Sequence, residues 1–501
     1  DINEVAFEWT KTLSSSPSYI DDFANEITAG SDGSIYIAGY TKGNLDGQNL
    51  TGTSDAFITK YNLDGLRSWT RTLGSSLDEY FATTANSITT SSDGSIYIAG
   101  YTEGSVDGQT FNGGDTDGFI SKYNSNGVRD WIRLLVTFDD PSGIYSGFDP
   151  HEPLDIDPYE PIDPYEYYVI DDSANAITTG SDGSIYIAGK ITSQDPIDGS
   201  FNDYSDAFIS KFNPDGTKDW TRIFGSHIDG PLDLLEDDPY LFSNTFESPN
   251  EDSVNAITTS SDGSIYITGF TRGELDGQTF NGGASDAFIS KFNPDGTKDW
   301  TRLLGSSEDD IAKAITFGSD GSLYITGITG GDLDGQTNNG FNDAFISKFN
   351  SDGTKDWTRL LGSSDYDNAN GITTGSDGSI YITGNTKGDF DGENFNGGYG
   401  FTDTFISKFN SDGTRNWTSL LGSSENNSGN SITTDDDGSI YITGSSDSDV
   451  FLLKFNPNPT DILLTHTSFD ENINAGDVIA TLSTIDKEPL ESFTYEFING
   501  E

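Results

Sequence analysis

The residues of this chain best suited to chemistry are carboxylates that recur at fixed positions, most regularly in Asn-x-Asp-Gly-x-x-Asp segments. Oxygen atoms at alternate positions of a tight loop can wrap a hard cation such as Ca²⁺. The full calcium-loop pattern is absent, and an Asx-stabilised hairpin turn explains the same spacing. We favour the turn and keep a metal site as the alternative. The segments are Asn213/Asp215/Asp219, Asn293/Asp295/Asp299 and Asn350/Asp352/Asp356.

A second recurring carboxylate follows an apolar residue and precedes a glycine in six loops. Six acidic loops around one opening could bind cations or sugar hydroxyls, whereas solvated turns are the simpler interpretation, which we favour. These ligand-binding candidates are Asp46, Asp107, Asp198, Asp276, Asp334 and Asp391.

Two long insertions, 136–170 and 226–251, supply the remaining candidates for ligand binding. The first places Tyr159 and Tyr165 among prolines and carboxylates, a composition that suits contact with a carbohydrate or a protein. A proline-stiffened loop covering an opening is the alternative. His151 and His227 lie one in each insertion, so a two-histidine metal site is conceivable. Because no GxSxG motif or arginine cluster accompanies them, we predict no catalytic residues and a protein that is not an enzyme.

Two β-hairpins alternate along the chain and must position these residues. The stretch DAFISKFNPDGTKDWTRLLG, 286–305, returns nearly unchanged at 206–225 and 343–362, and looser copies begin at Asp55, Asp117 and Asp403. The other hairpin is NAITTSSDGSIYITG, 255–269, and it also recurs. Units of four short strands, with a step of 57 positions from Trp300 to Trp357, predict the blades of a β-propeller.

The seventh copy of the first hairpin starts at Asp449 and stops before any tryptophan. A spare strand of the missing type lies at the N-terminus, in residues 5–12. We therefore predict an all-β, seven-bladed propeller over residues 1–456, with four-stranded blades and the N-terminal strand completing blade 7. Residues 457–501 change in composition and predict a linker followed by part of a β-sandwich.

The two kinds of connection in such a ring predict two different faces. If strands A to D run from the axis outward, the A–B and C–D turns are short and nearly invariant between copies. The B–C loops are longer, and both insertions are D–A connections on the same face. Elaborated loops on a rigid scaffold usually carry the function, so we expect the ligand face there and the chain ends opposite.

The charge and composition of the chain limit the classes of partner that we expect. The net charge of −57 repels phosphate backbones, so we expect no nucleic acid, whereas cations, Ca²⁺ above all, are expected as cofactors. The chain has no cysteine and no methionine, which excludes disulfides and suggests a processed or longer precursor. No apolar run predicts membrane insertion. An acidic, cysteine-free repeat protein is typical of extracellular or cell-surface bacterial proteins.

The blades resemble the SBBP-type β-propeller repeats of bacterial surface and secreted proteins, through SDGSIYITG, SDAFISKFN and PDGTKDWTRLLG. The tail resembles the start of a cadherin-like domain, through the segments at Asn458, 469–472, 475–476 and 481–486. That resemblance implies calcium ligands at Glu471 and at the acidic positions Asp486 and Glu488, although Asp486-Lys487-Glu488 departs from the family's D-x-D element. It also implies an adhesive or matrix architecture.

We therefore predict a non-catalytic extracellular or cell-surface binding or scaffold protein, stabilised by calcium, that recognises a glycan or a surface protein. One alternative is a polysaccharide lyase or hydrolase with its site at the channel mouth. Another is the subunit of a surface polymer, with self-association through the C-terminal segment.

Overall fold

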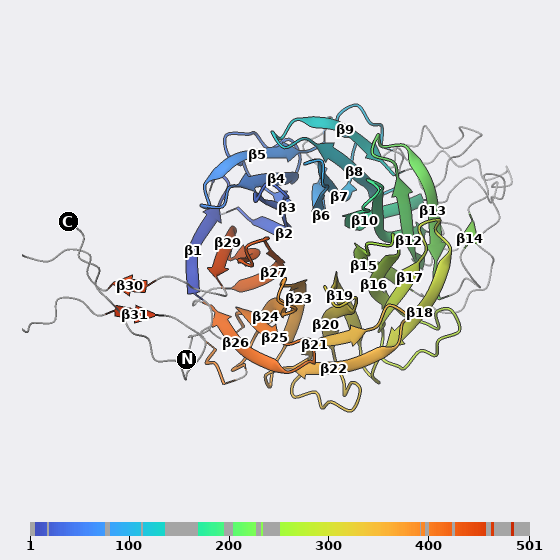
Figure 1. Ribbon diagram of the computed structural model, residues 1–501. Helices are drawn as coiled ribbons and strands as arrows, with labels where there is room; N and C mark the ends of the chain where they lie inside the picture. The colour runs from blue at the N-terminus through green and yellow to red at the C-terminus, as the bar shows by residue number, and fades with distance from the viewer. Residues whose placement is uncertain are drawn as a thin grey trace, which may run out of the picture.

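The computed structural model is a ring of seven antiparallel sheets around a central channel (Figure 1). It describes residues 6–17, 20–75, 81–111, 114–135, 169–194, 204–226, 232–233, 251–390, 392–395, 400–422, 426–456, 462–464 and 482–484. All regular elements in these ranges are strands, so none is a helix long enough to cross a membrane. The predicted all-β, seven-bladed propeller with four-stranded blades is confirmed.

The first three blades follow one another around the ring, each with its A strand nearest the channel (Figure 1). Blade 1 comprises β2 (Asp22–Ala29), β3 (Ile35–Thr41), β4 (Asp55–Tyr61) and β5 (Arg67–Leu73). Blade 2 comprises β6 (Thr83–Thr90), β7 (Ile96–Thr102), β8 (Asp117–Tyr123) and β9 (Arg129–Leu134). Blade 3 comprises β10 (Val169–Thr179), β11 (Ile185–Gln194), β12 (Tyr204–Phe212) and β13 (Lys218–Phe224), with β14 (Leu232–Asp233) added at its outer edge.

The other blades repeat this order, and only blade 7 combines strands from both ends of the chain. Blade 4 comprises β15 (Asp252–Thr259), β16 (Ile265–Thr271), β17 (Asp286–Phe292) and β18 (Lys298–Leu304). Blade 5 comprises β19 (Asp310–Phe317), β20 (Leu323–Thr329), β21 (Asp343–Phe349) and β22 (Lys355–Leu361). Blade 6 comprises β23 (Asp367–Thr374), β24 (Ile380–Thr386), β25 (Asp403–Phe409) and β26 (Arg415–Leu421). Blade 7 comprises β27 (Asn427–Thr434), β28 (Ile440–Ser446), β29 (Asp449–Asn456) and β1 (Ala6–Leu13).

The N-terminal strand closes the ring, as the missing half of the seventh hairpin predicts. β1 pairs antiparallel with β29, from Ala6 opposite Asn456 to Leu13 opposite Val450. The strand extends one residue beyond the predicted range, because Leu13 is buried in a cluster with Phe57 of blade 1. Both strand ends at the Ala6–Asn456 pair lie at the tight-turn end of blade 7, as expected.

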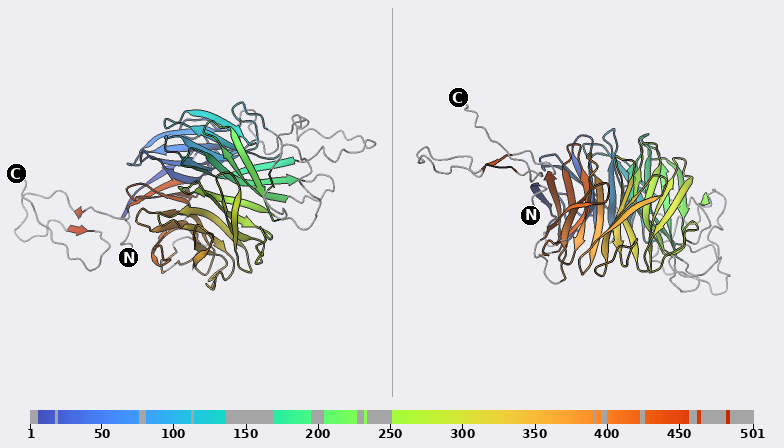
Figure 2. Two further views of the ribbon diagram at one scale, coloured as in Figure 1. Left: turned by 45° about the vertical axis from the view of Figure 1, so that its right-hand side comes forward. Right: turned by 60° about the horizontal axis from the view of Figure 1, so that its bottom comes forward.

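The blades stack through their B and C strands, which are buried over nearly their whole length. In blade 4 the side chains of Ile265, Ile267 and Phe288 have no exposed area. Strands buried on both faces read as continuous apolar runs rather than alternating ones. Each hydrophobic cluster joins residues of adjacent blades, so the core lies between the sheets, which stand side by side around the ring (Figure 2).

In six of the seven blades, a tryptophan on the D strand packs against the C–D turn of the next blade. Trp300 lies under Gly353 and its Nε1 donates to the Ser351 carbonyl at 3.3 Å. Arg302 covers the indole, 5.5 Å from its centroid, and its Nε donates to the Gly353 carbonyl at 3.1 Å. The tryptophan therefore packs at the outer blade interface, beneath an arginine of its own strand.

The tail is described only in part. β30 (Ile462–Leu464) pairs with β31 (Leu482–Thr484) as a two-stranded antiparallel sheet. The remaining residues of the predicted tail domain lie outside the described ranges, so its cadherin-like character stays a prediction.

Candidate functional site

The C–D turns predicted as metal candidates are closed by their own hydrogen bonds. In blade 4, Asp295 Oδ1 accepts from the Thr297 backbone N–H at 2.9 Å and from its hydroxyl at 2.6 Å. Asn293 Nδ2 donates to the same hydroxyl at 2.9 Å. The hydroxyl bond, followed by the backbone bond, lowers the pKa of Asp295. This is the geometry of a side-chain-stabilised turn.

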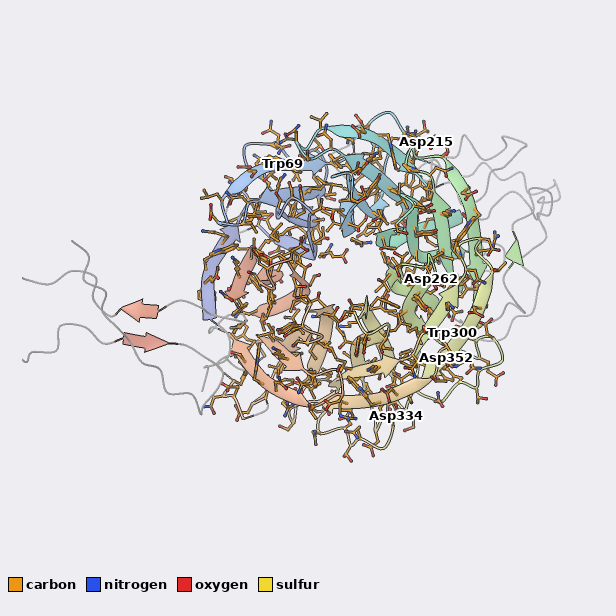
Figure 3. The ribbon with its side chains drawn as sticks, in the orientation of Figure 1. Trp69, Asp215, Asp262, Trp300, Asp334 and Asp352 are labelled. Atoms are coloured by element: carbon orange, nitrogen blue, oxygen red, sulfur yellow. The ribbon has the colours of Figure 1, made fainter. Side chains whose placement is uncertain are left out.

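The turns of blades 3 and 5 have the same arrangement, and Figure 3 labels Asp215 and Asp352 within them. Thr217 donates to Asp215 and Thr354 donates to Asp352, while Asn213 and Asn350 donate to the two threonine hydroxyls.

The third carboxylate of each turn has a different partner, a lysine on the C strand. Asp219 pairs with Lys211 at 3.3 Å and Asp299 with Lys291 at 3.0 Å. Asp356 lies 3.8 Å from Lys348. Among the described residues no group of three or more histidine, cysteine, aspartate or glutamate side chains is placed to hold a metal ion. Cation binding by these turns stays a prediction.

The aspartates of the B–C loops lie beside the outer strands rather than around the channel mouth, and Figure 3 shows Asp334 at the outer rim. Each of the four described aspartates has a positive φ and precedes a glycine with positive φ, as a tight hairpin turn requires. The apolar residue before the aspartate is buried between two blades, for example Leu333, which folds the loop back over the blade.

All four of these aspartates form ion pairs with the first residue of the D strand. Asp46 lies 2.8 Å from Arg67, Asp107 pairs with Arg129, Asp276 with Lys298 and Asp334 with Lys355. Asp276 and Asp334 also accept from Thr301 and Thr358. These contacts give the aspartates a structural role, and ligand binding by them stays a prediction.

Several further candidates lie outside the described residues, so the structure does not place them. They are Asp198, Asp391, Tyr159, Tyr165, His151, His227, Glu471, Asp486 and Glu488.

Six of the seven A strands carry an asparagine at their bulge, and these side chains form a ring around the channel. Each side chain donates to a backbone carbonyl of the next blade, as Asn255 does to Ala312 at 2.9 Å. The ring closes when Asn430 of blade 7 donates to Ala24 of blade 1 at 2.8 Å. The members are Asn25, Asn86, Asn175, Asn255, Asn370 and Asn430.

Two titratable side chains interrupt the symmetry of the channel. Blade 5 has Lys313 in place of asparagine, and its Nζ donates to Asn370 Oδ1 at 3.0 Å. Burial lowers the pKa of Lys313 to about 8. In blade 1, Glu26 accepts from the Ser87 hydroxyl and from the Ile88 N–H, the latter at 2.7 Å, and burial raises its pKa to about 7. Titratable groups perturbed in this way mark candidate functional sites.

Exposed aromatic side chains gather on the loop-rich face, where the B–C loop of blade 5 meets the D–A connection into blade 6. The rings of Phe341 and Tyr366 stack at 4.9 Å with 9° between their planes, although they are 62% and 40% exposed. Lys387 Nζ lies 5.4 Å from the Tyr366 centroid. Phe401, in the next B–C loop, is 38% exposed. We call Phe341, Tyr366 and Lys387 the aromatic patch.

The patch departs from the repeat. At the matching positions of the blade 4–5 boundary stand Ala284 and Asp309, whose N–H and carboxylate form a hydrogen bond. The blade 5–6 boundary therefore replaces a polar link by two large exposed rings. A second stacked pair, Phe23 and Tyr40, lies at the loop-rich end of blade 1, with ring centroids 5.0 Å apart. Lys42 lies 6.0 Å from the Tyr40 centroid.

The tight-turn face has fewer features suited to ligand binding. A shallow hollow of about 540 Å³ there is lined mainly by serines and glycines of the A–B turns in blades 4 to 6, together with Phe317 and Thr374.

The sequence-based candidates did not include Glu26, Lys313 or the aromatic patch. The available signal was departure from the repeat: KAIT at 313–316 replaces NAIT, and NEIT at 25–28 is the one copy with a carboxylate after the asparagine.

Comparison with known proteins agrees with this architecture. Residues 356–391 and 416–451 match the SBBP family, described as a beta-propeller repeat. The chain carries SBBP-type repeats. Residues 180–221 match DUF5122, a beta-propeller domain of unknown function.

One curated relative is the regulatory protein FlaEY of Caulobacter vibrioides, 28% identical over 231 residues, which are 43% of this chain. The matched region spans 24% of that relative's length.

Solved structures with a similar fold include two lyases and a WD40 domain. Virginiamycin B lyase from Staphylococcus aureus is 14% identical with a TM-score of 0.42, covering 89% of this chain and 99% of that one. An ulvan lyase is 10% identical with a TM-score of 0.44, covering 88% and 95%. The WD40 domain of Neurospora crassa Pan2 is 9% identical with a TM-score of 0.42, covering 86% and 88%. At these values the likeness carries no argument about function.

Proposed function

We propose that this chain is a non-catalytic binding protein of the cell exterior or surface, whose loop-rich face recognises a glycan. The observation that carries the proposal is the exposed stack of Phe341 on Tyr366. Burying each ring would gain free energy, yet both stay accessible, at 62% and 40% exposure.

The chemistry of the patch suits a sugar. An exposed ring face packs against the C–H face of a pyranose, while Lys387 and neighbouring carboxylates and amides can bind its hydroxyls. A protein partner would use the same rings as anchors, since aromatic residues are enriched at interface centres.

A glycan array tests this proposal with the wild-type chain and with Phe341→Ala and Tyr366→Ala. The matched control is Leu66→Ala, because Leu66 is also 62% exposed but belongs to a C–D turn on the opposite face. We expect either aromatic variant to reduce glycan binding at least about tenfold, which corresponds to about 1.4 kcal/mol, while the control binds like wild type. Equal binding by all four proteins would refute the assignment.

A second candidate function, polysaccharide cleavage in the channel, is favoured by Glu26 and Lys313. A carboxyl group with its pKa near 7 and an amine with its pKa near 8 are suited to proton transfer at neutral pH. Turnover of an acidic polysaccharide that is lost in both Glu26→Gln and Lys313→Asn would favour this function. Turnover that survives both changes would exclude these residues as its acid and base.

A further inference from the structure

A row of buried polar residues crosses blades 1, 2, 4, 5 and 6 at the loop-rich end. In blade 5 the row is Asp310, Thr329 and Asp343, which are neighbours in the strand register and have no exposed area. Rows of adjacent blades meet because the Asp310 N–H donates to the Ser285 carbonyl of blade 4 at 2.7 Å. This bond brings Asp310 next to Asp286, the residue after Ser285.

In each carboxylate of this pair, one oxygen accepts all the hydrogen bonds from the neighbouring loop. Asp310 Oδ2 accepts from the Ser306 N–H at 2.5 Å and from its hydroxyl at 2.8 Å. Asp286 Oδ2 accepts from the N–H and the side-chain amide of Asn281, at 2.6 and 2.9 Å. The Oδ1 atoms of both aspartates are buried and have no hydrogen-bond partner. Two fixed carboxylates therefore each leave one buried oxygen unused.

The next interface repeats the arrangement. The Asp367 N–H donates to the Asn342 carbonyl at 2.8 Å, which brings Asp367 next to Asp343. Asp367 Oδ2 accepts from the Ser363 N–H and hydroxyl, and Asp343 Oδ2 accepts from the Asn339 N–H. The Oδ1 atoms of Asp343 and Asp367 again lack a hydrogen-bond partner, and both residues are fully buried.

These pairs carry an uncompensated charge. No ion pair between described residues engages Asp286, Asp310, Asp343 or Asp367. Burial, with Asp286 adding to it, raises the pKa of Asp310 to about 6, and burial beside Asp343 raises that of Asp367 to about 6. Two buried like charges are costly unless a countercharge lies between them.

The interface between blades 1 and 2 shows what a single carboxylate does at the same place. Thr83 occupies the position of the second aspartate there. Asp55 then accepts from the N–H and hydroxyl of Thr51 and from the Gly52 N–H, which satisfies both of its oxygens. At this interface the single carboxylate therefore leaves neither of its oxygens unused.

A glycine keeps the main chain close to the unused oxygens. A Cβ at Gly305 would stand 2.2 Å from Asp286 Oδ1, and one at Gly362 would stand 2.0 Å from Asp343 Oδ1. Any side chain at these two positions would fill the space beside the carboxylate, so the site admits only a small occupant.

We infer that the pairs Asp286/Asp310 and Asp343/Asp367 are divalent-cation sites between blades, with Ca²⁺ as the ion that fits them. A divalent cation neutralises two carboxylates and binds hard oxygen donors, and Ca²⁺ completes its shell with hydroxyl, carbonyl and water oxygens. Asp22 and Asp449 form a third pair with the same unused Oδ1 atoms, between blades 1 and 7. These sites are separate from the C–D turns and independent of glycan binding.

Calcium titration of the EGTA-treated wild-type chain tests the inference by calorimetry and by thermal melting at about 1 mM Ca²⁺. The double variant Asp310→Asn/Asp367→Asn gives these two interfaces one carboxylate each. We expect it to bind two fewer Ca²⁺ ions than wild type and to lose most of the calcium-dependent rise in Tm. The matched control, Asp295→Asn/Asp352→Asn, removes the turn carboxylates and should behave like wild type.

Wild-type crystals grown with Ca²⁺ give a readout that does not depend on the variant folding. Because the chain has no cysteine or methionine, anomalous density cannot come from sulfur. A peak between Asp286 and Asp310 confirms the site. An absence of density there, unchanged stoichiometry in the double variant, or a Tm that responds to pH but not to Ca²⁺ would overturn the inference in favour of proton sharing.

Discussion

The indole of Trp300 lies under the α-carbon of Gly353 in the next blade, so close that a Cβ on residue 353 would stand 2.8 Å from Trp300 Cδ2. The same contact joins Trp69 to Gly127 and Trp357 to Gly413 (Figure 3 labels Trp69 and Trp300). Six of the seven blades are linked to the next blade in this way at the outer edge of the ring. Blade 6 is the exception, because blade 7 has no C–D turn for Trp417 to pack against.

We predict that Gly353→Ala destabilises the chain more than Gly321→Ala. Both glycines have a φ of 80°, so both alanines bear the same backbone strain, about 1–3 kcal/mol. A Cβ at Gly321 meets nothing within 4 Å, whereas one at Gly353 meets the indole. Thermal melting should therefore show a larger loss for Gly353→Ala, and equal losses would mean that the Trp300 contact contributes nothing.

Ring closure predicts a strong effect at Leu13. This side chain is 1% exposed and packs against blade 1 from the N-terminal strand. Leu13→Ala should cost about 2–5 kcal/mol of unfolding free energy, because it leaves a cavity at the seam. Phe7→Ala in the same strand is the control, since Phe7 is 55% exposed. Denaturant unfolding that does not separate the two variants would contradict this account of the seam.

Lys313→Asn should stabilise the protein at neutral pH, because it removes a poorly solvated charge and places asparagine at the one A-strand bulge that lacks it. Below its folded-state pKa of about 8, Lys313 is charged in both the folded and the unfolded chain. In that pH range the folded state is therefore destabilised by the full free-energy cost of burying the charge. Between pH 8 and 10.5 the unfolded chain binds more protons than the folded one, and wild-type stability should rise with pH. The advantage of the variant should shrink across that window, and an advantage independent of pH would show that charge is not its cause.

Glu26→Gln should show the opposite dependence. The pKa of Glu26 rises from 4.5 to about 7 on folding, so the folded state binds more protons between these values. Wild-type stability should therefore fall, relative to the variant, as pH rises from 4.5 to 7. The side-chain amide oxygen of the variant can still accept from the Ser87 hydroxyl and the Ile88 N–H, as the carboxylate does in the wild type. Melting curves of both proteins at matched pH values measure this difference, and parallel curves would exclude a raised pKa.

Much of the fold could be predicted from the sequence because every copy of the repeat predicts the same local structure. The Asp-Gly turns, the apolar B and C strands and the single tryptophan of each unit agree with one another, so the blade is over-determined. The copy that begins at Asp449 lacks its second strand, and this local absence was enough to predict a contact between the two ends of the chain.

The candidate site could not be predicted to the same extent, because its chemistry depends on contacts between copies. From the sequence alone, Asp334 would be read as an exposed acidic residue of a loop. In the structure, the buried Leu333 directs the loop back over the blade, where Asp334 pairs with Lys355. The sequence indicates that Asp286 begins a strand, but it does not indicate that Asp310 of the next blade lies beside it. The repeated sequence specifies the structure within each blade. The packing of one blade against the next determines which side chains of the two blades come into contact.

The pairing of β1 with β29 has a mechanical consequence. The ladder begins at Ala6 and Asn456, where one strand enters and the other leaves, so both chain connections lie at the same end of the pair. A force that pulls these two connections apart acts along the inter-strand hydrogen bonds, which are perpendicular to antiparallel strands. It would load the bonds one after another, as in a zipper, instead of shearing them together. The tensile strength of the whole ring, if held by both ends, would then be set by the first few bonds of one strand pair.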